Sequence, residues 1–168
     1  MDTTRLFMKQ KMRNKHYLSL IIWIMALIAI GGIIGSLSKP EKLLWYSTLQ
    51  RSTLTPPKYI FPIAWTILYG MIGACGGLIW RSQALPKLSI IKTLYVGQLI
   101  LNWSWTPLFF HYHLTGLSLV VLGLMDILVC GLIWLAYKKI TAASLLMSPY
   151  LLWILLATYL NFYIWWYN

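Results

Sequence analysis

Leu101-Asn102-Trp103-Ser104-Trp105-Thr106-Pro107-Leu108-Phe109-Phe110 is the stretch that decides the fold. It places an amide among tryptophans in a segment otherwise apolar enough to lie in lipid. An asparagine in hydrocarbon is costly unless its donors and acceptors find partners inside the protein. The stretch therefore predicts a membrane helix that faces other helices. Gln98, Asn102 and Trp105 are spaced i, i+4 and i+7, so they share one stripe, which is the first candidate wall of an internal site.

The composition is that of a membrane protein. The chain has 168 residues, of which 60% are hydrophobic and only 10% charged, whereas an average soluble domain is about 25% charged. The formal net charge of +11 is compatible with nucleic-acid binding. The basic residues, however, lie at the ends of apolar runs, where cations meet lipid headgroups. We therefore expect a protein embedded in the lipid bilayer, with no nucleic-acid partner.

Five apolar runs indicate an all-α integral membrane bundle. From Tyr17 to Ser38 the chain runs 22 residues without a charge, longer than the apolar core of a signal peptide, about 7–15 residues. The first run is therefore a retained helix that follows a basic N-terminal tail, residues 1–17. The rest of the chain, residues 18–168, is predicted to form one five-helix transmembrane domain. Its predicted transmembrane helices are about 18–37, 59–80, 88–110, 117–137 and 142–166.

Residues 39–58 form the longest connection between predicted spans and are too polar to cross a bilayer. Long connections in compact proteins are often lids or binding loops. We therefore expect this segment to be a lid loop over the bundle, with a short interfacial helix at 41–50.

The basic residues also predict the orientation. The N-terminal tail, the 81–92 region and the 138–139 turn together carry ten Lys and Arg, whereas the 39–58 loop carries four. Cytoplasmic segments carry the excess of Lys and Arg. The N-terminus is therefore predicted to be cytoplasmic, and the protein to be multi-pass.

Two further stripes combine aromatic, small and amide residues. In the second predicted helix the stripe suits either a cavity or a close helix contact, and Gly73-x-x-x-Gly77 favours contact; Gly31-x-x-x-Gly35 in the first helix is a weaker sign of the same kind. The stripe of the second helix is Trp65, Tyr69, Gly73, Gly76 and Trp80, and that of the fifth is Tyr150, Trp153, Ala157 and Asn161. We predict that Trp65 and Trp153 face one shared cavity. The predicted ligand-binding residues are Trp65, Tyr69, Gln98, Asn102, Trp103, Trp105, Tyr150, Trp153, Ala157 and Asn161.

Several polar residues leave alternatives open. Asp126, an acid inside a span, is either a functional group or a structural contact between helices. Asn102 and Asn161 either bind a ligand carboxylate or hold helices together. His111 and His113 have no Cys or carboxylate with them, so we expect no metal site. Two thiols, Cys75 and Cys130, are predicted to be buried and free.

The chain also resembles a known family. The resemblance covers roughly residues 18–168 and lies in ordered blocks. They are Thr55-Pro56-Pro57, the run 61–69 (FPIAWTILY), Gly97-Gln98-Leu99, the run 101–105 (LNWSW) with Pro107 and Phe109-Phe110, the run 149–153 (PYLLW), Ala157-Thr158 and Leu160-Asn161. These residues resemble the translocator protein family, whose members are also called tryptophan-rich sensory proteins (TspO/MBR) or peripheral-type benzodiazepine receptors.

The resemblance implies a five-helix bundle, usually a homodimer, whose first loop covers a pocket for porphyrins, sterols such as cholesterol, and benzodiazepine-site drugs. It implies a role in tetrapyrrole regulation or transport, and for bacterial relatives a light- and oxygen-dependent degradation of protoporphyrin IX. The two tryptophans tied to that chemistry match Trp65 and Trp153, which are therefore the candidate catalytic residues. Porphyrin would be ligand or substrate, with no cofactor required. We expect a bacterial cell membrane as the location.

The chain departs from the family pattern in three places. Leu54 and Tyr59 stand where many relatives have tryptophan. No basic residue follows Lys139, so the cholesterol motif proposed for the animal members is incomplete here, with Trp166 at the matching position.

Three functions remain open at this point. The first is a membrane receptor or carrier for tetrapyrroles and other flat hydrophobic molecules. The second is an enzyme that degrades a photo-excited porphyrin in the same pocket. The chain has no pattern of a conventional hydrolytic or transfer site, but photochemistry on tryptophan needs none. The third is an assembly factor without a small ligand, which requires fully packed aromatic stripes.

Overall fold

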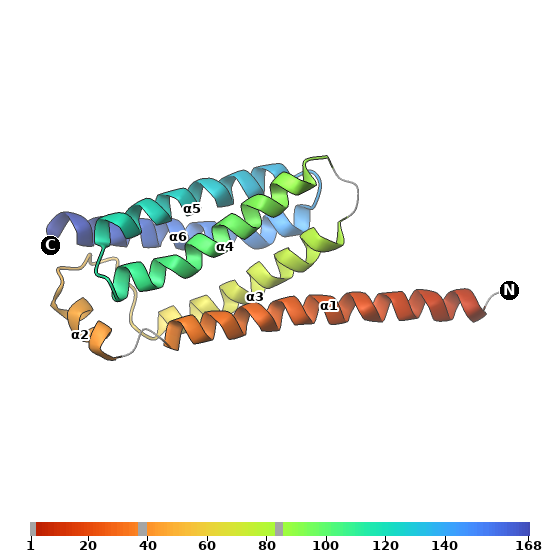
Figure 1. Ribbon diagram of the computed structural model, residues 1–168, viewed down its shortest axis with the longest axis horizontal. Coiled ribbons are helices and arrows are strands. Elements are labelled where there is room, and N and C mark those ends of the chain that lie inside the picture. The colour runs from red at the N-terminus through yellow and green to blue at the C-terminus, as the bar shows by residue number, and fades with distance from the viewer. Residues whose placement is uncertain (1–2, 37–39, 83–85) are drawn as a thin grey trace.

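The computed structural model describes residues 3–36, 40–82 and 86–168, with the side chains of 3–16 and 40–43 left aside. These residues form six helices and no strand (Figure 1). The helices are α1 (Thr3–Ser36), α2 (Pro40–Thr48), α3 (Ile60–Arg81), α4 (Leu88–Phe110), α5 (Thr115–Ala136) and α6 (Thr141–Tyr167).

Five of these helices form a membrane bundle. The Tyr17–Ser36 part of α1 and the whole of α3, α5 and α6 are long and apolar enough to cross a membrane. At 23 residues, and a rise of about 1.5 Å per residue, α4 also exceeds a hydrocarbon core of about 30 Å. Its polar side chains turn inward, since Gln98 is fully buried and Asn102 is 3% exposed. The protein is thus an all-α, multi-pass integral membrane bundle.

From α3 onward, every helix begins and ends within two residues of the predicted bounds. The first helix is longer than the predicted span, because it begins at Thr3 and takes in the basic tail. Residues 3–16 contain neither glycine nor proline and are rich in Lys, Arg, Met and Gln, which favour helix. The short helix predicted at 41–50 is α2, which has Pro40 at its first position, where a missing N–H is tolerated. Residue 39, where the predicted lid loop begins, lies outside the described residues.

The bundle is held together by packing rather than by exclusion of water, because lipid is as apolar as the helix faces. α1 packs on α3, α3 packs on α6, and α5 packs against both α4 and α6 (Figure 1). The core gathers one face of α3 to α6, and Ile72, Tyr95, Leu132 and Ile154 there are fully buried.

Small residues bring α1 and α3 close together. A Cβ added at Gly73 would lie 2.7 Å from Ile24 Cα and 2.8 Å from the Trp23 carbonyl oxygen. Such a contact is closer than side-chain carbon atoms tolerate, so the two backbones meet here because position 73 has no side chain. Of the two interpretations left open for this stripe, helix contact holds at Gly73.

One of the two thiols lies where the sequence predicts it. Both cysteines are free and Cys75 is buried, but Cys130 is exposed on the outside of α5. The prediction that Cys130 is buried is therefore wrong. An apolar span contains lipid-facing and core-facing residues of similar type, so composition alone does not separate them.

Candidate functional site

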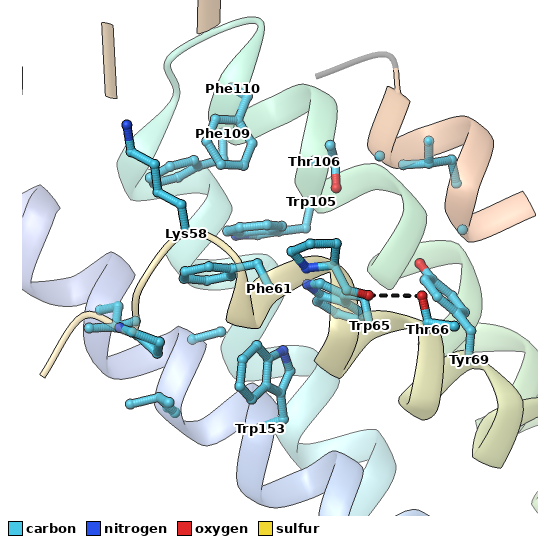
Figure 2. A pocket seen from close by; sticks show the side chains of 18 of the residues that line it. Lys58, Phe61, Trp65, Thr66, Tyr69, Trp105, Thr106, Phe109, Phe110 and Trp153 are labelled. Carbon is cyan, nitrogen blue, oxygen red and sulfur yellow. Dashed lines mark hydrogen bonds between the residues drawn. The ribbon is translucent and has the colours of Figure 1, made fainter. Parts of the chain in front are cut away.

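A cavity of about 530 Å³ lies at one end of the bundle, and Figure 2 shows side chains that line it. This end carries α2 and the C-terminus (Figure 1) and is here called the lid end. Five helices and the segment that follows α2 contribute to its wall. The lining residues are Ile28, Gly31, Gly32, Ile34 and Gly35 of α1; Tyr46 of α2; Pro56 and Lys58; Phe61, Pro62, Trp65, Thr66 and Tyr69 of α3; Trp105, Thr106, Phe109 and Phe110 of α4; and Trp153, Leu156, Ala157, Leu160, Asn161 and Ile164 of α6.

α3 and α6 supply a cluster of aromatic rings at the centre of the wall. Phe61, Trp65 and Tyr69 follow one another at intervals of four, which puts them on one face of α3. The Trp65 and Trp153 rings are perpendicular, with centroids 6.4 Å apart and an interplanar angle of 87°. The Phe61 ring lies 5.8 Å from that of Trp153, also at an edge-to-face angle. Such pairs are favourable for aromatic quadrupoles and leave ring surface facing the cavity (Figure 2).

The indole of Trp105 on α4 is held in place by α6. Its Nε1 donates a hydrogen bond to Asn161 Oδ1 at 3.1 Å, and Asn161 Nδ2 donates to the Thr115 carbonyl oxygen at 2.8 Å. Trp105 also stacks on Phe109, with centroids 5.2 Å apart. Asn161 therefore joins α4, α5 and α6 while it lines the cavity.

The segment predicted to be a lid contributes Tyr46, Pro56 and Lys58 to the cavity wall. The Tyr46 ring packs edge-on against Phe109, with centroids 6.2 Å apart. Burial raises the pKa of the Tyr46 hydroxyl, while the Arg51 guanidinium, whose central carbon lies 5.4 Å from the ring, opposes that shift. These contacts hold α2 against the end of α4.

Two polar contacts fasten this segment to α6. The Gln50 N–H donates to Asn168 Oδ1 at 2.8 Å, and Asn168 Nδ2 donates back to the Gln50 carbonyl oxygen at 3.2 Å. The hydroxyls of Ser52 and Tyr159 are 3.1 Å apart. The connection between α2 and α3 is thus attached at points outside the cavity as well as at its mouth.

A buried hydrogen-bond chain runs from the cavity wall into the bundle. Tyr69 Oη donates to Asn102 Oδ1 at 2.6 Å. Asn102 Nδ2 donates to Tyr150 Oη at 2.9 Å, and Tyr150 Oη donates to Gln98 Oε1 at 3.0 Å. The chain joins α3, α4 and α6 and satisfies most of the polar atoms that made this stripe costly in lipid.

The structure divides the ten predicted ligand-binding residues into two sets. Trp65, Tyr69, Trp105, Trp153, Ala157 and Asn161 line the cavity. Gln98, Asn102, Trp103 and Tyr150 are not among the lining residues of this cavity. Periodicity gives the face of a helix on which a residue lies but not its depth, and Tyr69 stands between the cavity and Asn102. Ligand binding by all ten residues stays a prediction, since no ligand contact tests it.

Asp126 makes a contact between helices. Its Oδ2 accepts a hydrogen bond from the Thr158 hydroxyl at 2.8 Å, and its Oδ1 is buried without a hydrogen-bond partner in the described part of the chain. Asp126 is not among the lining residues of the cavity. Of the two interpretations left open, the structure favours a link between α5 and α6.

Sequence reasoning missed several lining residues. Phe61 lies four residues before Trp65, so extending the aromatic stripe by one turn would have found it. Phe109 and Phe110 are the last two residues of the tryptophan-rich stretch and of α4, and they follow Pro107, which lies inside that helix. No sequence signal places Tyr46 over the cavity, because its position depends on how the lid segment folds back.

The lining can hold a flat apolar molecule but offers little for bond-breaking by acid or base. Indole and phenyl faces stack on flat rings, and cavities of about 300–1,000 Å³ with a few polar groups are typical of small-molecule sites. Within the described residues, no three His, Cys, Asp or Glu side chains are grouped as metal ligands would be. The aromatic rings are therefore the main groups of this site that a ligand could contact.

Comparison with known proteins gives a family model and several relatives that match most of the chain. The model of the TspO/MBR family matches residues 23–167. A tryptophan-rich protein TspO of Archaeoglobus fulgidus is 36% identical over 147 residues, covering 88% of this chain and 95% of its own length. The translocator protein of Bos taurus is 33% identical over 140 residues, covering 82% and 83%. The tryptophan-rich sensory protein of Cereibacter sphaeroides is 34% identical over 128 residues, covering 76% and 78%.

Proposed function

Because the chain belongs to the TspO/MBR family, we propose that it is a membrane receptor whose cavity binds porphyrins and other flat hydrophobic molecules. Sterols and benzodiazepine-site drugs belong to the same ligand class. A role in tetrapyrrole regulation or transport would follow from such binding. The observation that carries the proposal is the perpendicular Trp65 and Trp153 pair on the wall of a 530 Å³ cavity.

The shape and polarity of the cavity support this ligand class. Trp65, Trp105 and Trp153 reach it from three different helices, so a flat ring system can meet more than one indole. Ala157, Gly32 and Gly35 also line the cavity and leave room there, since an added Cβ on either glycine would meet no atom within 4 Å. A porphyrin offers a large apolar face that stacks on aromatic rings, which adds to the stabilisation from apolar burial.

The test is a titration of the protein, in nanodiscs of neutral lipid, with protoporphyrin IX in the dark, followed by the porphyrin absorption spectrum. Trp153→Ala removes one indole face and should weaken binding about tenfold, or about 1.4 kcal/mol. Trp134→Ala is the matched control, because Trp134 is 76% exposed on the outside of α5. An unsubstituted protein that does not bind the porphyrin, or a Trp134 variant that loses as much affinity, would contradict the proposal.

The second candidate function is light- and oxygen-dependent degradation of bound protoporphyrin IX. It is favoured by two indoles within 6.4 Å of each other on one wall, since indoles are the most readily oxidised side chains facing the cavity. Trp65→Phe and Trp153→Phe keep most of the apolar area but raise the cost of electron loss. Illumination in air should bleach the porphyrin with the unsubstituted protein, and much more slowly with either variant, while dark binding falls only a few-fold.

Orientation and assembly are part of the same proposal. The N-terminus is proposed to be cytoplasmic. The segments on its side of the membrane, which are the tail, the 81–92 region and the 138–139 turn, carry ten Lys and Arg, whereas the 39–58 loop on the opposite side carries four. The cavity would then open toward the outer side. Cysteine introduced at Thr3 should react only with a reagent supplied from the cytoplasm, and cysteine at Asn168 only from outside. A homodimer, usual in the family, should appear as twice the chain mass in detergent-corrected light scattering.

A further inference from the structure

The cavity wall carries a single charged side chain among its lining residues, Lys58. It lies in the segment between α2 and α3, and Figure 2 shows its amino group directed away from Trp153. The residue is exposed. A four-carbon stem with an ammonium at its end can therefore lie along the apolar rim while the charge stays near water.

Three other polar side chains on the wall, Asn161, Tyr69 and Thr66, already have protein partners. Asn161 receives the Trp105 indole N–H and donates to Thr115. The Tyr69 hydroxyl donates to Asn102, and the Thr66 hydroxyl donates to the Pro62 carbonyl oxygen at 2.8 Å (Figure 2). A ligand that took a hydrogen bond from the Tyr69 or the Thr66 hydroxyl would have to break one of these pairs, because each hydroxyl has a single hydrogen.

Among the side chains that the structure describes, no carboxylate neutralises Lys58. The chain has three acidic residues, and Asp126 is the one whose side chain is described. Asp126 accepts its hydrogen bond from Thr158, away from the cavity wall. Lys58 thus places a cation at the rim of the cavity, and none of the side chains that the structure describes supplies an anion to neutralise it.

We infer that Lys58 binds a carboxylate of the ligand, so that the cavity selects flat hydrophobic acids over neutral molecules of the same shape. This inference rests on the proposed function and specifies its ligand class. A carboxylate placed deep in the cavity would lose its hydration without gaining a charged partner. At the rim it keeps part of its water and gains a charge-assisted hydrogen bond. The ring system then lies against the indoles, and the acid faces out beside Lys58.

The experiment compares protoporphyrin IX, which has two carboxylates, with its dimethyl ester, which has none. Both are titrated in the dark against the protein in nanodiscs of neutral lipid. The unsubstituted protein should bind the acid about three- to tenfold more tightly than the ester. Lys58→Gln should lower affinity for the acid to that for the ester and leave the ester unchanged, whereas Lys58→Arg should keep the preference.

Lys138→Gln is the control, since Lys138 is an exposed lysine in the turn between α5 and α6, at the other end of the bundle. Equal binding of acid and ester by the unsubstituted protein would overturn the inference and leave the proposed function standing. An equal loss of affinity with Lys138→Gln, or a loss of both ligands with Lys58→Gln, would also overturn it. Failure of the unsubstituted protein to bind either ligand would overturn the proposed function itself.

Discussion

The two ends of the pair formed by α1 and α3 use the same residue types for opposite purposes. At one end, here called the basic end because Arg81, Lys87, Lys138 and Lys139 lie there, glycines of α3 meet the α1 backbone. A Cβ at Gly73 would lie 2.7 Å from Ile24 Cα. At the lid end, Gly32 and Gly35 of α1 face open space, with no atom within 4 Å of an added Cβ, and both line the cavity.

The aromatic residues repeat this contrast. At the basic end the Trp23, Trp80 and Tyr95 rings pack on one another, with the Trp23 and Trp80 centroids 5.0 Å apart. At the lid end, Trp65 and Trp153 meet edge to face and line a void. Glycine and tryptophan at helical spacing therefore do not by themselves distinguish a contact from a cavity. What distinguishes them is whether the facing helix supplies a ring or a backbone to fill the space.

The largest effect is expected from filling the close contact. Gly73→Leu forces a side chain against the backbone of α1, which cannot move aside as a side chain would, and overpacking of this kind costs about 1–3 kcal/mol. We expect a clear loss of thermal stability, measured by helical circular dichroism in detergent. Gly123→Leu is the control, because an added Cβ on that α5 glycine meets nothing within 4 Å. Equal stability of the two variants would mean that α1 and α3 do not pack as closely as the structure has them.

Filling the open end should affect binding instead of stability. Gly32→Leu places four carbon atoms at the cavity wall without a clash at the Cβ. The unfolding temperature should stay near that of the unsubstituted protein, while affinity for protoporphyrin IX falls about tenfold or more, since displaced ring contacts are each worth about 0.5–1.5 kcal/mol. Gly123→Leu again serves as the control. Full affinity in the Gly32 variant would show that the ligand does not use the α1 side of the cavity.

The contrast between the two ends also explains how far the sequence can be interpreted. Apolar runs predicted the long helices from α3 onward to within two residues, because the thickness of the bilayer sets how long an apolar helix must be. The stripe containing Trp65, Tyr69 and Gly73 was identified as one face of a helix. The sequence could not show that this face meets a cavity at Trp65 and a helix at Gly73, because that depends on the path of α1.

The sequence also could not show how deep within the bundle each residue of a stripe lies. Asn102 and Trp105 share a stripe on α4, yet Asn102 is bonded to Tyr69 and Tyr150 in the interior, while Trp105 lines the cavity. Three residues along a helix amount to about 4.5 Å of rise, and that step was enough to change the role. The contribution of Tyr46 to the wall depends on how α2 folds back, which no local pattern encodes.

A smaller effect is expected from replacing Asn102 or Asn161, and the two replacements should differ in how they change porphyrin affinity. Asn102→Leu removes the acceptor of the Tyr69 hydroxyl, and buried hydrogen bonds between membrane helices are worth about 0.6 kcal/mol on average. We therefore expect a modest loss of stability and a change in porphyrin affinity of less than threefold. Asn161→Leu releases the Trp105 indole that faces the ligand and should reduce affinity more. If Asn102→Leu costs more affinity than Asn161→Leu, the division between cavity wall and buried chain is wrong.

The smallest effect is expected at the exposed polar contacts between the α2–α3 connection and the C-terminus. Asn168→Ala removes both hydrogen bonds to Gln50, and an exposed pair of this kind contributes about 1 kcal/mol or less to holding the segment down. The aromatic contacts of Tyr46 with Phe109 remain, so the closed position should still dominate. We expect porphyrin to enter and leave about two- to fourfold faster, measured by stopped-flow absorption, with a dissociation constant changed by less than twofold. Tyr159→Phe, which removes the hydroxyl beside Ser52, should act in the same direction. Unchanged rates in both variants would mean that ligands reach the cavity between helices, without movement of the segment that joins α2 to α3.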